Sequence, residues 1–195
     1  MSRRGCFGKY GDIKRRDCLR HSGLPALPIH QASIERRPAH PQPGKISIRR
    51  ADPSDKEFVS SLSGKVFSVY GPYEVLVTGW FESELTWTFV AFEKGRSVGF
   101  AMMGRLFDDR ENRNRCELLA IAVEPNLQRR GVGGMLLRKI EEEAQRLGEA
   151  SLFLHTALNN LPAQALFRKS QFTSLMLKKD FYPAGQHALM MTKLF

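Results

Sequence analysis

The chain has 195 residues, of which 42% are hydrophobic and 26% are charged, and its formal net charge is +10 at pH 7. This length suits one globular domain with a core of its own. The longest apolar run, residues 118–123, is far shorter than the roughly 20 residues of a membrane-spanning helix. No apolar stretch follows the basic start, as one would in a secretory signal. We therefore expect a protein that does not associate with membranes.

Cysteine usage points to the compartment. Cys6, Cys18 and Cys116 are an odd set without the spacing of a disulfide framework, as is typical of free thiols in a reducing environment. Cys18 and His21 make one Cys-x-x-His pair without a second pair, so we expect no zinc site and no other metal. The sequence thus favours a cytoplasmic location.

The positive charge is concentrated at the start of the chain. Residues 1–44 contain nine Lys or Arg against three acidic residues, a net of +6, and five of the ten prolines. They have no sustained apolar period, so they cannot bury enough surface to offset the entropy of ordering. We predict a basic, proline-rich, disordered extension at 1–44 and a folded domain at 45–195. Such an extension can attract nucleic acid or a ribosome, but a solvated linker, a transit segment or a misassigned start codon would have the same composition.

The first half of the folded part reads as strand, two helices and a hairpin. Asp52 followed by Pro53 is an N-cap with proline at the first helical position, and alternation around Trp87 indicates a strand. The expected elements are, in order, a strand at 46–48, a helix from Pro53 to about Val66, a helix from Pro72 to about Glu82, hairpin strands at 86–91 and 98–106 with a turn at Lys94-Gly95, and a loop at 108–115.

The second half alternates strands and helices. Residues 118–123 are apolar on both faces, as in a central strand that is covered on two sides. A glycine-rich turn follows, and then a helix with one apolar stripe that ends at Gly148. The remaining elements are a strand at 151–156, a helix at 161–170, and strands at 172–179 and 187–194. This order predicts a mixed α/β fold with a β-loop-α crossover at its centre.

The turn from Gln128 to Gly134 is the most informative segment. Its glycines let backbone N–H groups approach an anion, and the start of the following helix adds a partial positive charge. Arg129 and Arg130 add charge at the same point. The segment has neither the Lys-Ser/Thr ending of an ATP-binding loop nor the glycine spacing of a dinucleotide fold. It therefore predicts a pyrophosphate site, with a plain glycine-rich turn and solvated arginines as the alternative.

Residues 117–134 resemble the acetyl-CoA signature of the GNAT (Gcn5-related) N-acetyltransferases, Arg/Gln-x-x-Gly-x-Gly/Ala after the fourth strand. Residues 154–167, followed by Phe172, resemble the fifth strand and next helix of that family. The resemblance covers 46–195, and its second half is similar in particular to ribosomal-protein alanine and other protein N-terminal acetyltransferases. It implies a mixed, mostly antiparallel central sheet with helices on both faces and two splayed central strands.

The resemblance also implies an activity. The expected reaction is direct transfer of an acetyl group from acetyl-CoA to a primary amine, on a protein N-terminus or a lysine. A small-molecule amine acetyltransferase and a non-catalytic acyl-CoA-binding module are the alternatives. The partners are then acetyl-CoA and the amine substrate, in a monomer or a homodimer. The implied cofactor-binding residues are Ile121, Ala122, Val123, Gln128, Arg129, Arg130, Gly131, Val132, Gly133, Gly134, Asn160 and Phe167.

Three residues are candidates for the chemistry. The family often places a carboxylate at the position of Glu117, where it removes the amine proton through water, and a solvated charge at a strand end is the alternative. At His155, protein N-terminal acetyltransferases have Glu or His with an acid/base role, and a buried structural histidine is the alternative. Asn160 could equally be only the N-cap of its helix.

The sequence departs from its relatives at two positions. At Phe167 the ribosomal-protein alanine acetyltransferases usually have a tyrosine that protonates the coenzyme A sulfur, and phenylalanine has no proton to donate. Tyr182 or an ordered water could take over this role. Gln171 replaces the glycine that usually precedes the Phe of this motif, so we expect strain where the helix ends.

Overall fold

The structure is a computed structural model that describes residues 44–108 and 113–195. All but the last residue of the predicted extension lies outside the described residues, as do Cys6 and Cys18. The division of the chain at residue 44 therefore stays a prediction.

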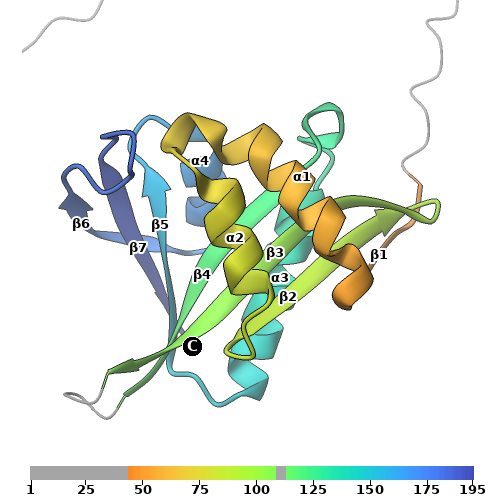
Figure 1. Ribbon diagram of the computed structural model, residues 1–195. Helices are drawn as coiled ribbons and strands as arrows, with labels where there is room; N and C mark the ends of the chain where they lie inside the picture. Colours follow the sequence, from red (N-terminus) through yellow and green to blue (C-terminus); the bar gives the residue numbers. More distant parts are fainter. Residues whose placement is uncertain (1–43, 109–112) are drawn as a thin grey trace, which may run out of the picture. The chain divides into compact units, whose positions relative to one another are not determined.

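The described residues form one seven-stranded sheet with helices on both of its faces (Figure 1). The strand order is β1-β2-β3-β4-β5-β7-β6, and every neighbouring pair except β4 and β5 is antiparallel. This architecture confirms the expected fold class. The elements are β1 (Ile46–Arg50), α1 (Lys56–Phe67), α2 (Tyr73–Phe81), β2 (Thr86–Glu93), β3 (Arg96–Asp108), β4 (Arg113–Val123), α3 (Val132–Arg146), β5 (Ser151–Ala157), α4 (Leu161–Lys169), β6 (Thr173–Lys178) and β7 (Ala188–Leu194).

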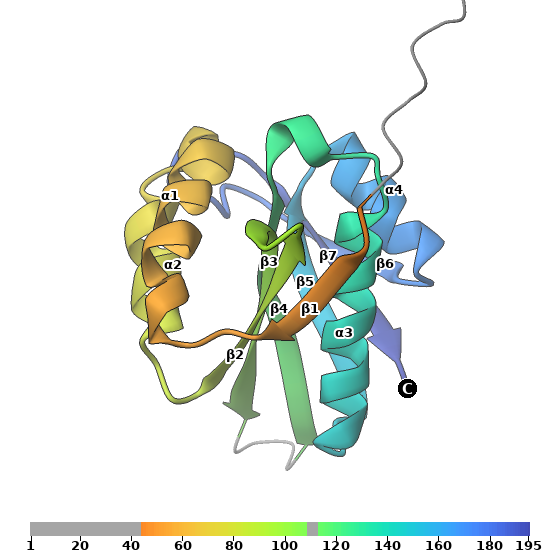
Figure 2. The ribbon, with the colours of Figure 1, turned by 90° about the vertical axis from the view of Figure 1, so that its right-hand side faces the viewer.

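The apolar core has two layers, one on each face of the sheet. Helices α1 and α2 cover one face, where Val59 and Leu62 pack against the buried ring of Phe100. Helices α3 and α4 cover the other face, where Leu136 and Phe167 belong to the larger cluster (Figure 2). Alternate residues of β2, β3 and β4 pack into the two clusters, so both faces of these strands are buried and their sequences are almost continuously apolar.

The turn that leads into α1 has the predicted cap, whereas α1 itself begins three residues later than predicted, at Lys56. Asp52 accepts a hydrogen bond from the Ser54 N–H at 2.9 Å, and the Asp55 carboxylate accepts one from the Asp52 N–H at 2.9 Å, which completes a capping box around Pro53. A short 3₁₀ turn, Pro53–Asp55, precedes the α-helix.

The predicted loop at 108–115 is wrong at both ends. Strand β3 continues to Asp108 and β4 begins at Arg113, so the pairing runs on through Asp108 and Arg113. Polar residues in that stretch suggested a loop, but the antiparallel ladder already formed by the preceding residues extends the hairpin regardless of their polarity.

Strands β4 and β5 pair only briefly. Their parallel ladder covers Cys116 to Leu118 opposite Leu152 to Leu154, and the strands then diverge. A bulge sets in at the same point, because Leu119 has no counterpart on β3. Gly104 makes room for it, since a Cβ there would lie 2.9 Å from the Leu119 Cδ1. Bulges increase local twist, so the irregularity accounts for the splayed central strands.

Candidate active site

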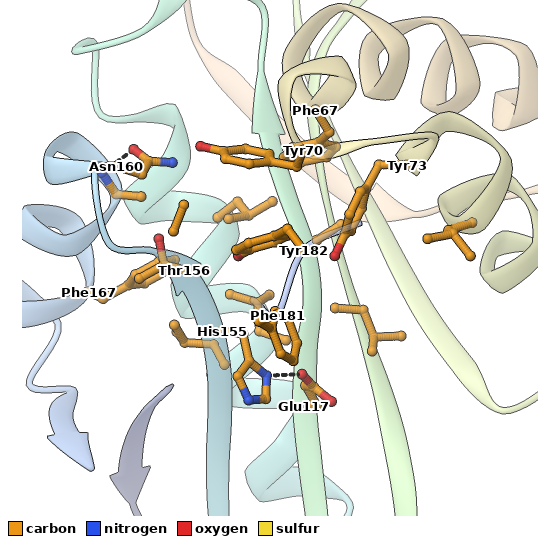
Figure 3. A pocket seen from close by; sticks show the side chains of 18 of the residues that line it. Phe67, Tyr70, Tyr73, Glu117, His155, Thr156, Asn160, Phe167, Phe181 and Tyr182 are labelled. Atoms are coloured by element: carbon orange, nitrogen blue, oxygen red, sulfur yellow. Dashed lines mark hydrogen bonds and ion pairs between the residues drawn. The ribbon is translucent and has the colours of Figure 1, made fainter. Parts of the chain in front are cut away.

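A cavity of about 260 Å³ lies where β4 and β5 separate. Its floor is formed by the two strands, one side by α4, and the other side by residues from α1, α2 and the loop between β6 and β7 (Figure 3). This volume lies just below the usual range for ligand pockets, about 300–1,000 Å³, so the cavity can enclose a small group but not an entire large ligand.

Glu117 and His155 face each other across the gap between the strands. The His155 Nδ1 lies 2.7 Å from the Glu117 Oε1. Both side chains are largely buried, with exposed fractions of 18% for Glu117 and 8% for His155. An ionised carboxylate can only accept, so beside an ionised Glu117 the Nδ1 carries a proton, and a neutral ring then has its lone pair on Nε2. That Nε2 is buried and has no hydrogen-bond partner among the described residues.

Aromatic rings hold His155 from two directions. Phe181 stacks on the imidazole with ring centroids 4.4 Å apart and planes 18° apart, while Phe153 meets it edge-on at 6.0 Å. Since Glu117 fixes the ring through Nδ1, the imidazole has little freedom to rotate. The pair is therefore positioned before any substrate binds.

A strap formed by residues 180–187 closes the side of the cavity opposite α4. The Gln186 Nε2 donates to the Val69 carbonyl at 2.6 Å and the Ala184 N–H donates to the Tyr70 carbonyl at 3.2 Å. Tyr182 of the strap packs against Tyr70, with ring centroids 4.8 Å apart and planes 32° apart. The turn between α1 and α2 and the strap thus act as one wall.

Tyr182 is buried, with an exposed fraction of 8%, and its hydroxyl lies on the Phe167 side of the cavity (Figure 3). Burial raises the pKa of Tyr182 well above its ordinary value, and the neighbouring Tyr73 adds to the rise. A free thiol has a pKa of about 8.5. Proton transfer from Tyr182 to a thiolate is therefore unfavourable, and the phenol is better suited to donate a hydrogen bond to the sulfur.

The predicted pyrophosphate loop adopts a conformation that glycine permits. Gly131 has a φ of 87° and is the N-cap of α3, and no side chain of the described residues caps this helix start. A Cβ on Gly131 would meet no protein atom within 4 Å. Arg129 also has a positive φ, 60°. Open space in front of uncapped N–H groups fits an anion.

Arg130 is engaged elsewhere. Its guanidinium forms an ion pair with Glu93 at the end of β2, at 2.6 Å. The Gln128 amide donates to the Val123 carbonyl at 3.2 Å, which ties the loop to the end of β4. The roles of these side chains toward a cofactor stay predictions.

Two residues at the far side of the cavity were singled out from the sequence. Asn160 is the N-cap of α4, and its side chain accepts from the Ala163 N–H at 3.2 Å. Phe167 is buried against Phe172. Gln171 has a φ of 69°, a left-handed conformation that glycine would adopt without strain.

The structure brings only part of the predicted set to the cavity wall. Glu117, Ile121, His155, Asn160, Phe167 and Tyr182 line it, whereas Ala122, Val123 and the loop from Gln128 to Gly134 do not. Sequence reasoning missed Tyr70, Tyr73 and Phe181. The aromatic residues clustered at 67–73 were a possible signal, but aromatic residues more often mark a core.

The described residues contain no candidate metal site. Within 44–108 and 113–195, no group of three His, Cys, Asp or Glu side chains could hold a metal ion. None of the helices in these ranges is long and apolar enough to cross a bilayer.

Residues 56–172 match the model of the Acetyltransferase (GNAT) family, so this chain belongs to that family. Among curated proteins, a [Ribosomal protein bS18]-alanine N-acetyltransferase of Salmonella typhimurium is 36% identical over 91 residues, and its Escherichia coli counterpart is 30% identical over the same length. The matched segment is 47% of this chain and 57% of each relative.

Solved structures agree on the fold. Arabidopsis thaliana NAA60, solved in complex with a bisubstrate analogue, superposes with a TM-score of 0.68 at 14% identity over 77% of this chain and 99% of that one. The ribosomal-protein-S18-alanine N-acetyltransferase of Escherichia coli gives 0.59 at 22% identity over 77% and 94%. At these identities the likeness shows a shared fold.

Proposed function

We propose that this chain transfers the acetyl group of acetyl-CoA to a primary amine, and that the amine is the N-terminus of a protein. The observation that carries the proposal is the Glu117–His155 pair, buried in a cavity at the point where β4 and β5 separate. A carboxylate that fixes an imidazole tautomer, with the second ring nitrogen unpartnered, is an arrangement that can remove a proton.

The described residues fit the cofactor that the family uses. Beyond Leu118, the edge of β4 that faces β5 has no ladder partner, so its backbone groups can pair with an extended amide chain. The N–H groups at the start of α3 and the open space beside Gly131 suit a pyrophosphate. Asn160, at the start of α4, lines the side of the cavity that α4 forms. We infer that the acyl end lies beside the Glu117–His155 pair.

In the proposed reaction, the amine nitrogen forms a bond to the acetyl carbon as the bond from that carbon to sulfur breaks. The Glu117–His155 pair takes the amine proton. Tyr182 donates a hydrogen bond to the departing sulfur. The thiolate takes a proton from water, since Phe167 has none to give, and the proton held by the pair passes to the resulting hydroxide, which restores the pair. Placing the amine beside the thioester in a closed cavity supplies much of the rate.

A protein N-terminus fits this site better than a lysine. An α-amino group has a pKa of about 7.7–8.0, so it is partly neutral at pH 7, whereas a lysine amine at about 10.4 is almost wholly charged. A charged amine would have to lose hydration among the rings of Phe67, Tyr73 and Trp80. The curated relatives bear the name of an alanine N-acetyltransferase that acts on a ribosomal protein.

The experiment is a panel of peptides that differ only at the N-terminus, tested with acetyl-CoA by release of free coenzyme A. One peptide has a free α-amine, one has that amine blocked and an internal lysine, and small amines complete the panel. We expect release only with the free α-amine. Release with the blocked peptide or with small amines alone would overturn the choice of substrate, and no release with any amine would overturn the activity.

Further sequence predictions remain proposals of the same kind. We propose a cytoplasmic enzyme, monomeric or homodimeric, whose basic extension at 1–44 contributes salt-dependent attraction to a ribosome or another acidic partner.

A further inference from the structure

The Glu93 carboxylate accepts three hydrogen bonds. The Arg130 Nη2 donates to its Oε1 at 2.6 Å and the Arg130 Nη1 to its Oε2 at 3.3 Å. The Gly44 N–H also donates to Oε1, at 3.0 Å. A Cβ on Gly44 would lie 2.9 Å from the Glu93 Cγ, so the chain passes closely over this side chain. Glu93 is thereby fixed in place.

The β2–β3 hairpin determines where that carboxylate lies. Lys94 and Gly95, with φ of 51° and 77°, form the two-residue turn, and Glu93 pairs with Arg96 directly before it. The hairpin end therefore presents Glu93 to the segment at 128–134. Arg130, the residue before Gly131, meets it there.

The end-on pairing uses both terminal nitrogens of the Arg130 guanidinium. These are the nitrogens with which an arginine grips a phosphate in a two-point contact. An end-on contact with a phosphate next to the start of α3 would need the same two N–H groups, so Arg130 can make that contact only by leaving Glu93. Glu93 is largely buried, at 13% exposed, but Arg130 is partly exposed, at 33%, so solvent reaches the guanidinium and screens the pair in part.

We propose that Glu93 is a positioning residue that competes with the phosphates of coenzyme A for Arg130 and so weakens cofactor binding. The inference rests on the proposed use of the loop at Gly131 for the pyrophosphate. Weaker binding of coenzyme A favours release of the product, which is the slow step in many enzymes. Neither the family match nor the relatives' names assign a role to Glu93.

The test is calorimetric binding of coenzyme A to the full chain, without any amine. Glu93→Gln keeps an oxygen for the Gly44 N–H but removes the charge that holds Arg130. We expect it to bind coenzyme A about 3- to 10-fold more tightly, the scale of one partly exposed ion pair. Arg130→Gln should bind more weakly than the native chain, and Glu93→Gln should have no further effect in that background.

Two controls separate this mechanism from a general change in charge. Glu124→Gln removes one negative charge beside the same loop, but Glu124 pairs with Lys65 at 3.1 Å, so this variant should leave the affinity unchanged. Pantetheine, which has no phosphate, should bind the native chain and Glu93→Gln equally.

Equal or weaker binding of coenzyme A by Glu93→Gln would overturn the proposal. So would the same gain in the Arg130→Gln background, in Glu124→Gln, or with pantetheine, since each would show that Arg130 is not the residue released. If the native chain binds no coenzyme A at all, the cofactor proposal itself fails. If it binds coenzyme A but Glu93→Gln brings no gain, only the role of Glu93 fails.

Discussion

The hydrogen bond between Glu117 and His155 makes a specific prediction about Glu117→Gln. An ionised carboxylate accepts from the Nδ1–H, at 2.7 Å. A glutamine amide placed there can donate to Nδ1 instead, which moves the ring proton to Nε2. The remaining lone pair of the ring, on Nδ1, then accepts from the glutamine amide, so none is free to take the amine proton. Glu117→Ala lacks this donor and leaves the tautomer free.

The magnitude follows from the role of a general base, which contributes about 10²- to 10⁴-fold in rate. We expect Glu117→Gln to lower turnover by about 10²-fold or more at neutral pH, which is about 2.7 kcal/mol of activation free energy. Glu117→Ala should lose less. Because the two side chains act as one unit, combining Glu117→Gln with His155→Asn should be no slower than the slower single variant, whereas independent groups would multiply their losses.

The assay is turnover of a confirmed peptide substrate from pH 6 to 9, together with the thermal shift produced by acetyl-CoA, which should not change. Raising the pH should restore part of the lost rate, since more of the amine is neutral without a base. Glu142→Gln, an exposed residue on α3 near Lys139, is the matched control. Native turnover and an unchanged pH profile for Glu117→Gln would refute the general-base role, and equal rates for the Gln and Ala variants would refute the tautomer argument.

Three further predictions concern the cofactor loop, the strap and the core. Gly131→Val should abolish the acetyl-CoA thermal shift, because the side chain fills open space, whereas Gly148→Val, which has a similar φ of 74° at the other end of α3, should keep it. Tyr182→Phe should slow turnover. It should also make the free energy of unfolding fall less steeply with pH above about pH 10, because a tyrosine whose pKa is raised by folding contributes stability that is lost as the pH rises. Cys116 should resist alkylation until the protein unfolds, as mass spectrometry would detect, since burial and then the Glu149 charge raise its pKa to about 12. A shift retained by Gly131→Val, an unchanged alkaline titration of Tyr182→Phe, or labelling of native Cys116 would contradict the respective arguments.

Sequence reasoning reached the elements whose signals are local. A capping residue before a proline located the 3₁₀ turn that leads into α1, and glycine-containing turns located the start and end of α3. The absence of glycine at Gln171 predicted a strained helix exit, and the φ of 69° there agrees. Each of these signals depends on a few adjacent residues whose backbone preferences are known.

The composition of the cavity was less accessible, because its walls come from distant parts of the chain. Gln186 donates to the carbonyl of Val69, which is 117 residues away in sequence. No local period indicates that the turn after α1 and the strap before β7 will meet. The ion pair between Arg130 and Glu93 was inaccessible for the same reason, because the two residues are distant in sequence and meet only through the geometry of the β2–β3 hairpin.

The position of the Glu117–His155 pair depends on a backbone irregularity. Glu117 and Phe153 are opposite each other in the short parallel ladder, so Glu117 and His155 come from adjoining strands at the last point where those strands are paired. One residue further along, the bulge at Leu119 directs β4 away from β5. The same irregularity therefore opens the cavity and leaves the Glu117–His155 pair in its lining. A sequence pattern identifies both residues as strand members, but only the end of the ladder explains why their side chains meet inside a cavity rather than within a closed sheet.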